Sequence, residues 1–127
     1  MRVLVDTNRY RDFCEGEPSA LEVVQKAARL YMPFVVIAEL RSGFLCGTQS
    51  RQNEKYLTMF LNSERVEALY PDENTTHHFA RIFAQLRLQG TPIPVNDIWI
   101  AALAVQHDLI LYSRDSHFDC LPQIARI

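Results

Sequence analysis

The sequence has few cysteines and no long apolar run, and each scarcity excludes a class of protein. Among its 127 residues are three cysteines, Cys14, Cys46 and Cys120, which lie far apart and form no C-x-x-C pair. This spacing argues against a zinc knuckle or a redox dithiol and favours free thiols in a reducing cytosol. No apolar stretch reaches the ~20 residues that span a membrane, and Asp6 and Arg9 interrupt any signal-peptide core. We therefore expect a cytoplasmic protein without a membrane segment.

Lysine is also scarce, and the formal net charge is only −2. Such a balance argues against a general polyanion binder, so nucleic-acid binding would need a local patch or a bridging metal. Apart from Lys26 and Lys55, every basic residue is arginine. Arginine suits bidentate phosphate contacts, although a bias in the base composition of the gene would give the same skew.

The chain shows no internal repeat, low-complexity segment or linker, and its hydrophobic share of 48% is ordinary for a globular core. At this length we expect one domain, residues 1–127.

Short β-type runs alternate with amphipathic or apolar segments along the chain. The runs predict strands at 2–5, 30–32, 66–70 and 109–113, with an edge strand at 125–127. The other segments predict helices at 18–29 and 50–61, a third between Asp72 and Gly90, and a buried fourth that Asn96 caps. This alternation predicts a parallel sheet with helices on both faces.

One segment, "PFVVIAELRSGFLCG", fits two kinds of structure. Its β-branched run Val35-Val36-Ile37 favours a strand. Phe34, Ile37 and Phe44 also share one face of a helix that would end at Gly47. We interpret it as a helix.

Four acids stand where a predicted strand gives way to a helix or turn. "VLVDTN" ends a buried strand on Asp6, Asp97 opens the buried helix, Asp115 follows "LILYS", and Glu39 lies in an apolar run. Such junctions share one edge of a parallel sheet, so the four carboxylates could converge there.

Each acid also has a purely structural interpretation. Asp6 and Asp97 could cap helices, and Asp115 could stabilise a turn. Glu39 is costly among apolar neighbours unless it is paired, for example with Arg41 or Arg2, or faces solvent. The conjunction of four acids nevertheless favours a shared site.

Carboxylates gathered in a cleft repel one another, and a divalent cation removes that conflict. Mg²⁺ or Mn²⁺ takes oxygen ligands and commonly bridges protein carboxylates to substrate phosphate. Without Cys or His at ligand spacing, zinc is not expected, and His77 and His78 are interpreted as helix-surface residues.

In order and spacing, "VDTN", "IAEL", "NDIWIAA" and "YSRDSHF" resemble the PIN domain, and more narrowly the VapC-type toxins of bacterial toxin–antitoxin pairs. The resemblance covers nearly the whole chain. It implies a three-layer, Rossmann-like α/β fold with about five short parallel strands and an acidic pocket. It also implies Mg²⁺- or Mn²⁺-dependent endoribonuclease activity that leaves a 5′-phosphate, a homodimer, and inhibition by a VapB-like antitoxin.

Carried over by position, the resemblance assigns functions to particular side chains. The catalytic set is Asp6, Glu39, Asp97 and Asp115, of which Asp6, Asp97 and Asp115 would hold the metal. Thr7, Asn8 and Ser113 would orient these carboxylates, and the candidate RNA contacts are Arg9, Arg11, Arg41 and Arg114. Arg9 departs from the family, where an apolar residue is common, and we expect it to face solvent. For Arg114 a salt bridge to a nearby acid is an equal alternative.

Three other functions compete with a toxin nuclease. A response-regulator receiver domain would need two adjacent acids after the first strand and a late lysine, but Thr7 follows Asp6 and no lysine lies beyond Lys55. A catalytically idle RNA- or protein-binding domain of the same fold, and a housekeeping RNA-processing PIN nuclease, both remain open.

Overall fold

The computed structural model describes residues 1–127 and has at its centre a parallel sheet in the order β3-β2-β1-β4. The strands are β1 (Arg2–Val5), β2 (Arg29–Pro33), β3 (Val66–Leu69) and β4 (Ile110–Tyr112). The expected fifth strand at 125–127 is only an isolated bridge between Leu111 and Arg126. The sheet thus has four strands where about five were expected.

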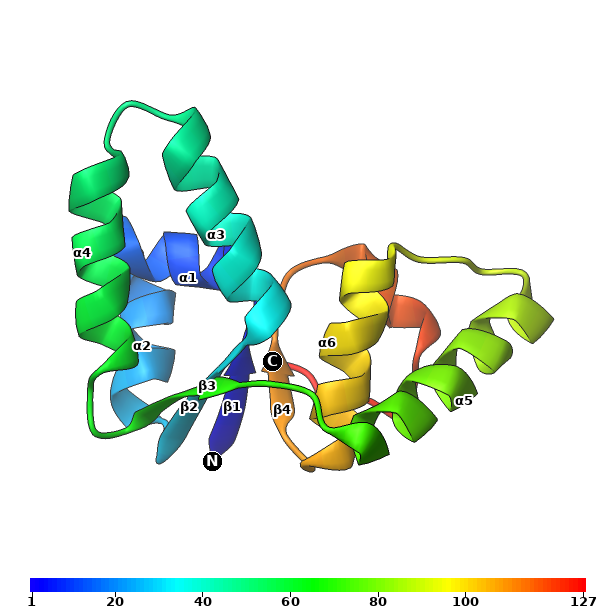
Figure 1. Ribbon diagram of the computed structural model, residues 1–127. Coiled ribbons are helices and arrows are strands. Elements are labelled where there is room, and N and C mark those ends of the chain that lie inside the picture. Colours follow the sequence, from blue (N-terminus) through cyan, green and yellow to red (C-terminus); the bar gives the residue numbers. More distant parts are fainter.

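Six α-helices and one 3₁₀ helix connect and cover the strands (Figure 1). They are α1 (Thr7–Cys14), α2 (Pro18–Lys26), α3 (Phe34–Cys46), α4 (Ser50–Leu61), α5 (Glu73–Gln89), α6 (Val95–Gln106) and the 3₁₀ helix η1 (Ser116–Cys120). The ambiguous segment is the helix α3, as predicted, whereas α1 was not foreseen. None of these helices has the length and apolar character to cross a membrane.

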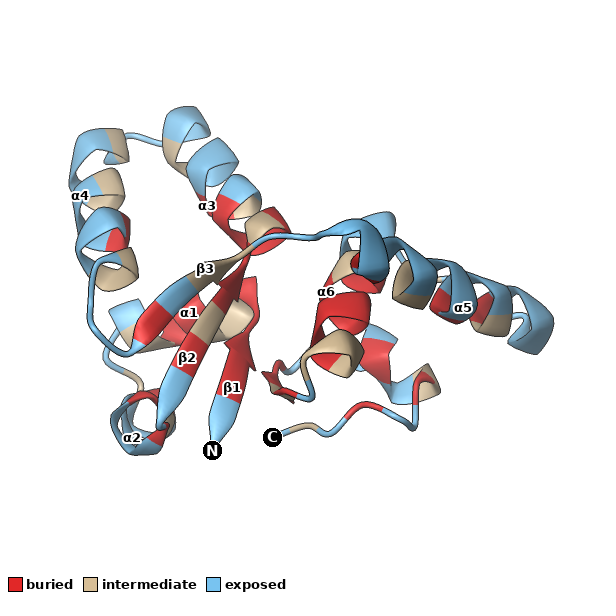
Figure 2. Ribbon diagram, turned by 60° about the horizontal axis from the view of Figure 1, so that its bottom comes forward, coloured by how far each residue is buried: buried red, intermediate tan, exposed pale blue.

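The helices fall into two groups beside the sheet. Figure 1 shows α1 to α4 gathered on one side of the molecule and α5 and α6 on the other, next to β4. Buried residues concentrate on the strands and on α6 (Figure 2). The α/β architecture with helices on both sides of a parallel sheet is confirmed.

Aromatic contacts hold α6 against its neighbours. The Trp99 ring of α6 lies 4.4 Å from the Phe79 ring of α5 and 5.9 Å from the Phe34 ring of α3, between centroids. Since Phe34 and Trp99 stand near the first turns of their helices, the N-terminal half of α3 lies beside the start of α6.

Two predicted helix ends were wrong. The helix predicted at 18–29 ends at Lys26, because Ala27 is already extended and Arg29 begins β2. The cap of α6 is Pro94, whose carbonyl accepts hydrogen bonds from the N–H groups of Asp97 and Ile98. Proline presets the extended backbone that a cap requires, so Asn96 lies inside the helix and its side chain is free for another contact.

Candidate active site

Asp6 and Ser113 leave the sheet side by side. Val5 of β1 is in register with Tyr112 of β4, so the next residue of each strand emerges at the same carboxyl edge. The Ser113 hydroxyl donates a hydrogen bond of 2.6 Å to Asp6 Oδ2, and both residues are buried. Asp6 is also the N-cap of α1, since its Oδ1 accepts the Thr7 N–H at 2.8 Å. The capping role and the site placement, posed above as alternatives, therefore coexist.

Asp115 joins this pair through the same serine. Its backbone N–H donates to Ser113 Oγ at 3.0 Å, and its own Oδ1 accepts the His117 N–H at 2.9 Å as the N-cap of η1. Asp115 thus stabilises a turn, which is one of the two roles considered for it from the sequence. The turn also places the carboxylate beside Asp97, which lies buried in the first turn of α6.

Glu39 reaches the cluster from α3. Its Oε2 accepts the Thr7 hydroxyl at 2.9 Å, and its Oε1 accepts the Asn96 amide at 3.1 Å. The pairing with Arg2 or Arg41 that the sequence left open does not occur. Arg41 forms a two-point contact with Glu54, and Arg2 donates to the His107 carbonyl. The four predicted acids therefore meet, together with Thr7 and Ser113. Asn8 adds a longer contact of 3.4 Å to Asp6 Oδ2.

Burial and like charge both disfavour ionisation in this cluster. Burial raises the pKa of Asp97 to about 6, and the negative charges of Asp115 and Asp6 add to the rise. Burial likewise raises the pKa of Asp6, with Glu39 and Asp115 contributing. Carboxylates in this state favour a proton or a cation.

His117 is the site residue that sequence reasoning missed. Its Nδ1 lies 2.8 Å from Asp97 Oδ2 and 3.0 Å from Asp115 Oδ1. Hydrogen bonding to Asp97 and the charges of both acids raise the pKa of this imidazole. The signal was present as the D-x-H spacing in "RDSHF", where a tight turn brings residues two apart together.

The four candidate arginines have different environments. Arg9 does not face solvent as expected: its guanidinium carbon lies 4.8 Å from the centre of the Tyr112 ring, and Nη1 lies 3.2 Å from Asp12 Oδ2. Arg114 pairs with the same oxygen of buried Asp12, also at 3.2 Å, which is the salt bridge posed as its alternative. Arg41 is held by Glu54, and Arg11 lines a pocket between helices described below.

Comparison with known proteins identifies the family. Residues 3–123 match the PIN domain. The chain belongs to the PIN-domain family. Among relatives of this PIN protein, Ribonuclease VapC4 of Mycobacterium tuberculosis is 30% identical over 93 residues, which are 73% of this chain and 72% of the relative. Ribonuclease VapC1 of Haemophilus influenzae is 33% identical over 87 residues, 68% of this chain and 63% of the relative.

Solved structures of similar shape come from toxin–antitoxin complexes. VapBC-1 from nontypeable Haemophilus influenzae superposes with a TM-score of 0.87 at 28% identity, covering 100% of this chain and 97% of that one. VapBC2 from Rickettsia felis, bound to a promoter DNA fragment, gives a TM-score of 0.86 at 21% identity and covers 100% and 98% of the two chains. The resemblance to VapC-type proteins inferred from the motifs is confirmed.

The donor set of this PIN domain fits a divalent cation. One oxygen each from Asp97 and Asp115 and one nitrogen of His117 all lie within 4.8 Å of one another. Asp6 extends the set through the Ser113 bridge to Asp115. Hard divalent ions take such carboxylate oxygens, and a cation would relieve the burial and mutual repulsion that raise the pKa values of Asp6 and Asp97.

Proposed function

We propose that this protein is a metal-dependent endoribonuclease that acts as the toxin of a toxin–antitoxin pair. The observation that carries the proposal is the convergence of Asp6, Glu39, Asp97 and Asp115 at the carboxyl edge of a parallel sheet. Its relatives named ribonucleases supply the substrate class.

In the proposed mechanism Asp6, Asp97 and Asp115 would hold Mg²⁺ or Mn²⁺. A divalent ion bound there supplies Lewis-acid chemistry, since it neutralises phosphate charge and lowers the pKa of the attacking water. Ser113 fixes the orientation of Asp6 and Asp115, and Thr7 with Asn96 fixes Glu39. These hydrogen bonds hold the carboxylates in position before substrate arrives, which lowers the cost of binding an ion.

Glu39 lies outside the group of Asp97, Asp115 and His117 and adds a further negative charge to the site. Only half-buried, and held by two neutral donors, Glu39 can orient the attacking water or a second ion. Arg114 is the best placed of the candidate RNA contacts, because it is 57% exposed and directly precedes Asp115. Its guanidinium can release the Asp12 carboxylate and bind a flanking phosphate instead.

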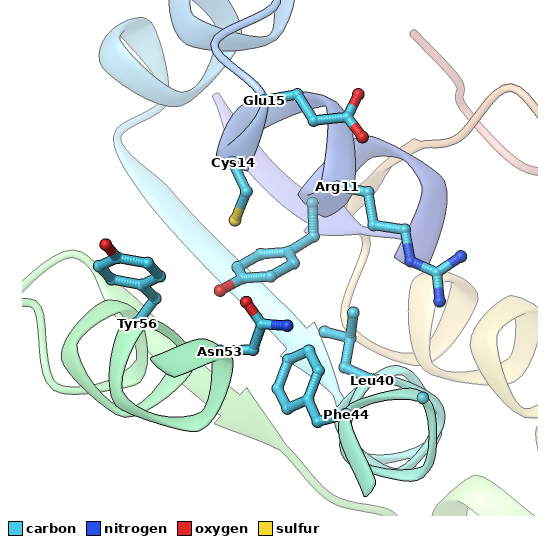
Figure 3. A pocket seen from close by; sticks show the side chains of 9 residues that line it. Arg11, Cys14, Glu15, Leu40, Phe44, Asn53 and Tyr56 are labelled. Atoms are coloured by element: carbon cyan, nitrogen blue, oxygen red, sulfur yellow. The ribbon is translucent and has the colours of Figure 1, made fainter. Parts of the chain in front are cut away.

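The antitoxin is proposed to occupy a groove along α1, α3 and α4. A pocket of about 430 Å³ lies there, and Figure 3 shows Cys14 of α1, Phe44 of α3 and Tyr56 of α4 among its lining side chains. A second pocket of about 500 Å³ shares Tyr56 and continues along α4 past Met59 and Phe60. Tyr56 and Met59 are 52% and 60% exposed, so this groove presents large apolar side chains to solvent. An amphipathic segment of a VapB-like antitoxin fits such a groove.

Cleavage of total RNA by the purified, antitoxin-free protein tests the function. We expect cleavage with Mg²⁺ or Mn²⁺, none with EDTA, and a loss of at least about 10³-fold in Asp97→Asn. Asp108→Asn is the matched control: Asp108 is exposed at a φ of 53°, which asparagine also tolerates, and its variant should cleave like wild type.

The outcome also separates the competing functions. Full activity in Asp97→Asn would refute the assignment of the site. No cleavage by the folded protein under any metal would favour the binding-domain alternative. Metal-dependent cleavage without any partner encoded in the adjacent reading frame would favour a housekeeping nuclease.

A further inference from the structure

We propose that His117 is a direct metal ligand and that it makes the site prefer a first-row transition ion over Mg²⁺. The inference rests on the proposed nuclease function and concerns which ion the site selects. It adds an imidazole nitrogen to what the sequence presented as an all-oxygen site.

The position of the ring is that of a ligand. Its Nδ1 lies 2.8 Å from Asp97 Oδ2 and 3.0 Å from Asp115 Oδ1. Adjacent ligands of an octahedral ion with bonds of 2.0–2.1 Å are separated by about 2.9 Å. The imidazole nitrogen thus already stands at the spacing of a neighbouring ligand from each of the two carboxylates.

The turn that carries His117 is fixed on both sides. The backbone N–H of His117 donates to Asp115 Oδ1 at 2.9 Å, and the backbone carbonyl of His117 accepts a hydrogen bond from the Cys120 thiol at 3.0 Å. The next residue, Phe118, is 1% exposed and anchors the turn in the core. This anchoring presents the imidazole to Asp97 at little entropic cost.

Because Nε2 of His117 has no partner, it can carry the ring proton and leave Nδ1 to bind a metal ion. The ring's contacts involve Nδ1 alone, so a neutral imidazole can carry its proton on Nε2 and offer the Nδ1 lone pair. Imidazole binds first-row transition ions with an affinity that is lowest for Mn²⁺ and rises along the series, whereas Mg²⁺ takes oxygen ligands and keeps its waters. A nitrogen ligand therefore adds affinity for Mn²⁺ or a later ion of the series and little for Mg²⁺.

Binding of the metal alone, without RNA, tests the inference. Mn²⁺ affinity is measured by electron paramagnetic resonance, and Mg²⁺ affinity by its competition with Mn²⁺. We expect wild type to bind Mn²⁺ at least about tenfold more tightly than Mg²⁺ and His117→Ala to lose about 10–100-fold in Mn²⁺ affinity. Mg²⁺ affinity should change less than about threefold, so that the preference collapses. His77→Ala, on the exposed surface of α5, is the matched control and should retain the preference.

A spectroscopic readout separates ligation from mere positioning. Electron spin echo modulation of bound Mn²⁺ should carry a ¹⁴N coupling in wild type and His77→Ala and lose it in His117→Ala. Equal loss of both metals without a ¹⁴N coupling would overturn the inference and leave His117 as a positioning residue for Asp97. If wild type binds neither ion, the proposed metal site itself fails. If both ions bind with equal affinity, only the role of His117 fails.

Discussion

Ser113 Oγ and Asp6 Oδ2 lie 2.6 Å apart although their residues are separated by 107 positions in the chain. The contact exists because β1 and β4 are adjacent parallel strands that end in register. The same hydroxyl oxygen accepts the Asp115 N–H, so one serine joins two of the proposed metal ligands. The site is therefore built where central strand β1 and edge strand β4 end side by side.

Replacing this serine should impair the site without unfolding the protein. In Ser113→Ala, Asp6 loses its side-chain donor and the Asp115 N–H loses its acceptor. We expect RNA cleavage and Mn²⁺ affinity to fall by about 10–100-fold, the usual effect of removing an orienting partner. Circular dichroism should be unchanged. Ser116→Ala, at an exposed position three residues along, is the control and should behave like wild type.

Metal-free protein should lose stability as the pH rises through the range in which Asp97 ionises. Burial raises its pKa from an ordinary 3.8 to about 6, so between these values the unfolded chain releases a proton that the folded protein retains. The cost is absent below about pH 4 and complete above about pH 6, and it amounts to at most about 3 kcal/mol. The raised pKa of His117 acts in the same direction, because its stabilising charge is lost as the pH rises through that pKa.

Urea unfolding in EDTA at several pH values checks this expectation. The free energy of unfolding of wild type should fall between pH 4 and 7 relative to that of Asp97→Asn, which lacks the ionising group. Asp108→Asn should follow wild type. Parallel pH profiles for wild type and Asp97→Asn would contradict the burial argument.

A bound divalent ion should offset the loss of stability that ionised Asp97 causes in the metal-free protein. An ion that binds only the folded protein at about 100 times its Kd stabilises by about 2.7 kcal/mol. For a domain of this size the corresponding rise in Tm is on the order of 5–10 °C. Thermal unfolding with Mn²⁺ and with EDTA should show this rise in wild type and not in Asp97→Asn. An equal rise in both proteins would mean that the ion binds elsewhere.

The groove along α1, α3 and α4 should be needed for the antitoxin and not for catalysis. Introducing a charge with Met59→Glu should weaken antitoxin binding at least about tenfold, since the new carboxylate would have to be desolvated on docking. Metal-dependent RNA cleavage by the free protein should persist. Leu88→Glu, at a 90% exposed position on α5, is the control for a surface charge. Co-purification with a tagged antitoxin measures the difference, and unchanged binding by Met59→Glu would place the antitoxin elsewhere.

Local patterns in the sequence were sufficient for most of the fold. Short β-type runs predicted the four strands, and apolar spacing predicted five of the six α-helices, because these signals depend only on near neighbours. The helix α1 escaped because "TNRYRDFC" is short and charged, and its stability comes from the Asp6 cap and the burial of Tyr10. The recurrence of acids along the chain, together with the resemblance to the PIN domain, was enough to predict the four carboxylates that meet, although only Asp6 and Asp115 follow strands.

The environment of each side chain was decided only by the tertiary structure. Arg9 lies over Tyr112 since β4 ends next to β1, a proximity that no local pattern encodes. Asn96 reaches Glu39 because Pro94 caps α6 and aromatic packing sets that helix beside α3. His117 meets Asp97 across a 20-residue separation when η1 folds back on α6. The sequence by itself thus determined most of the elements and the four candidate acids, while packing between distant elements determined which groups meet, because contact energies depend on proximity in space.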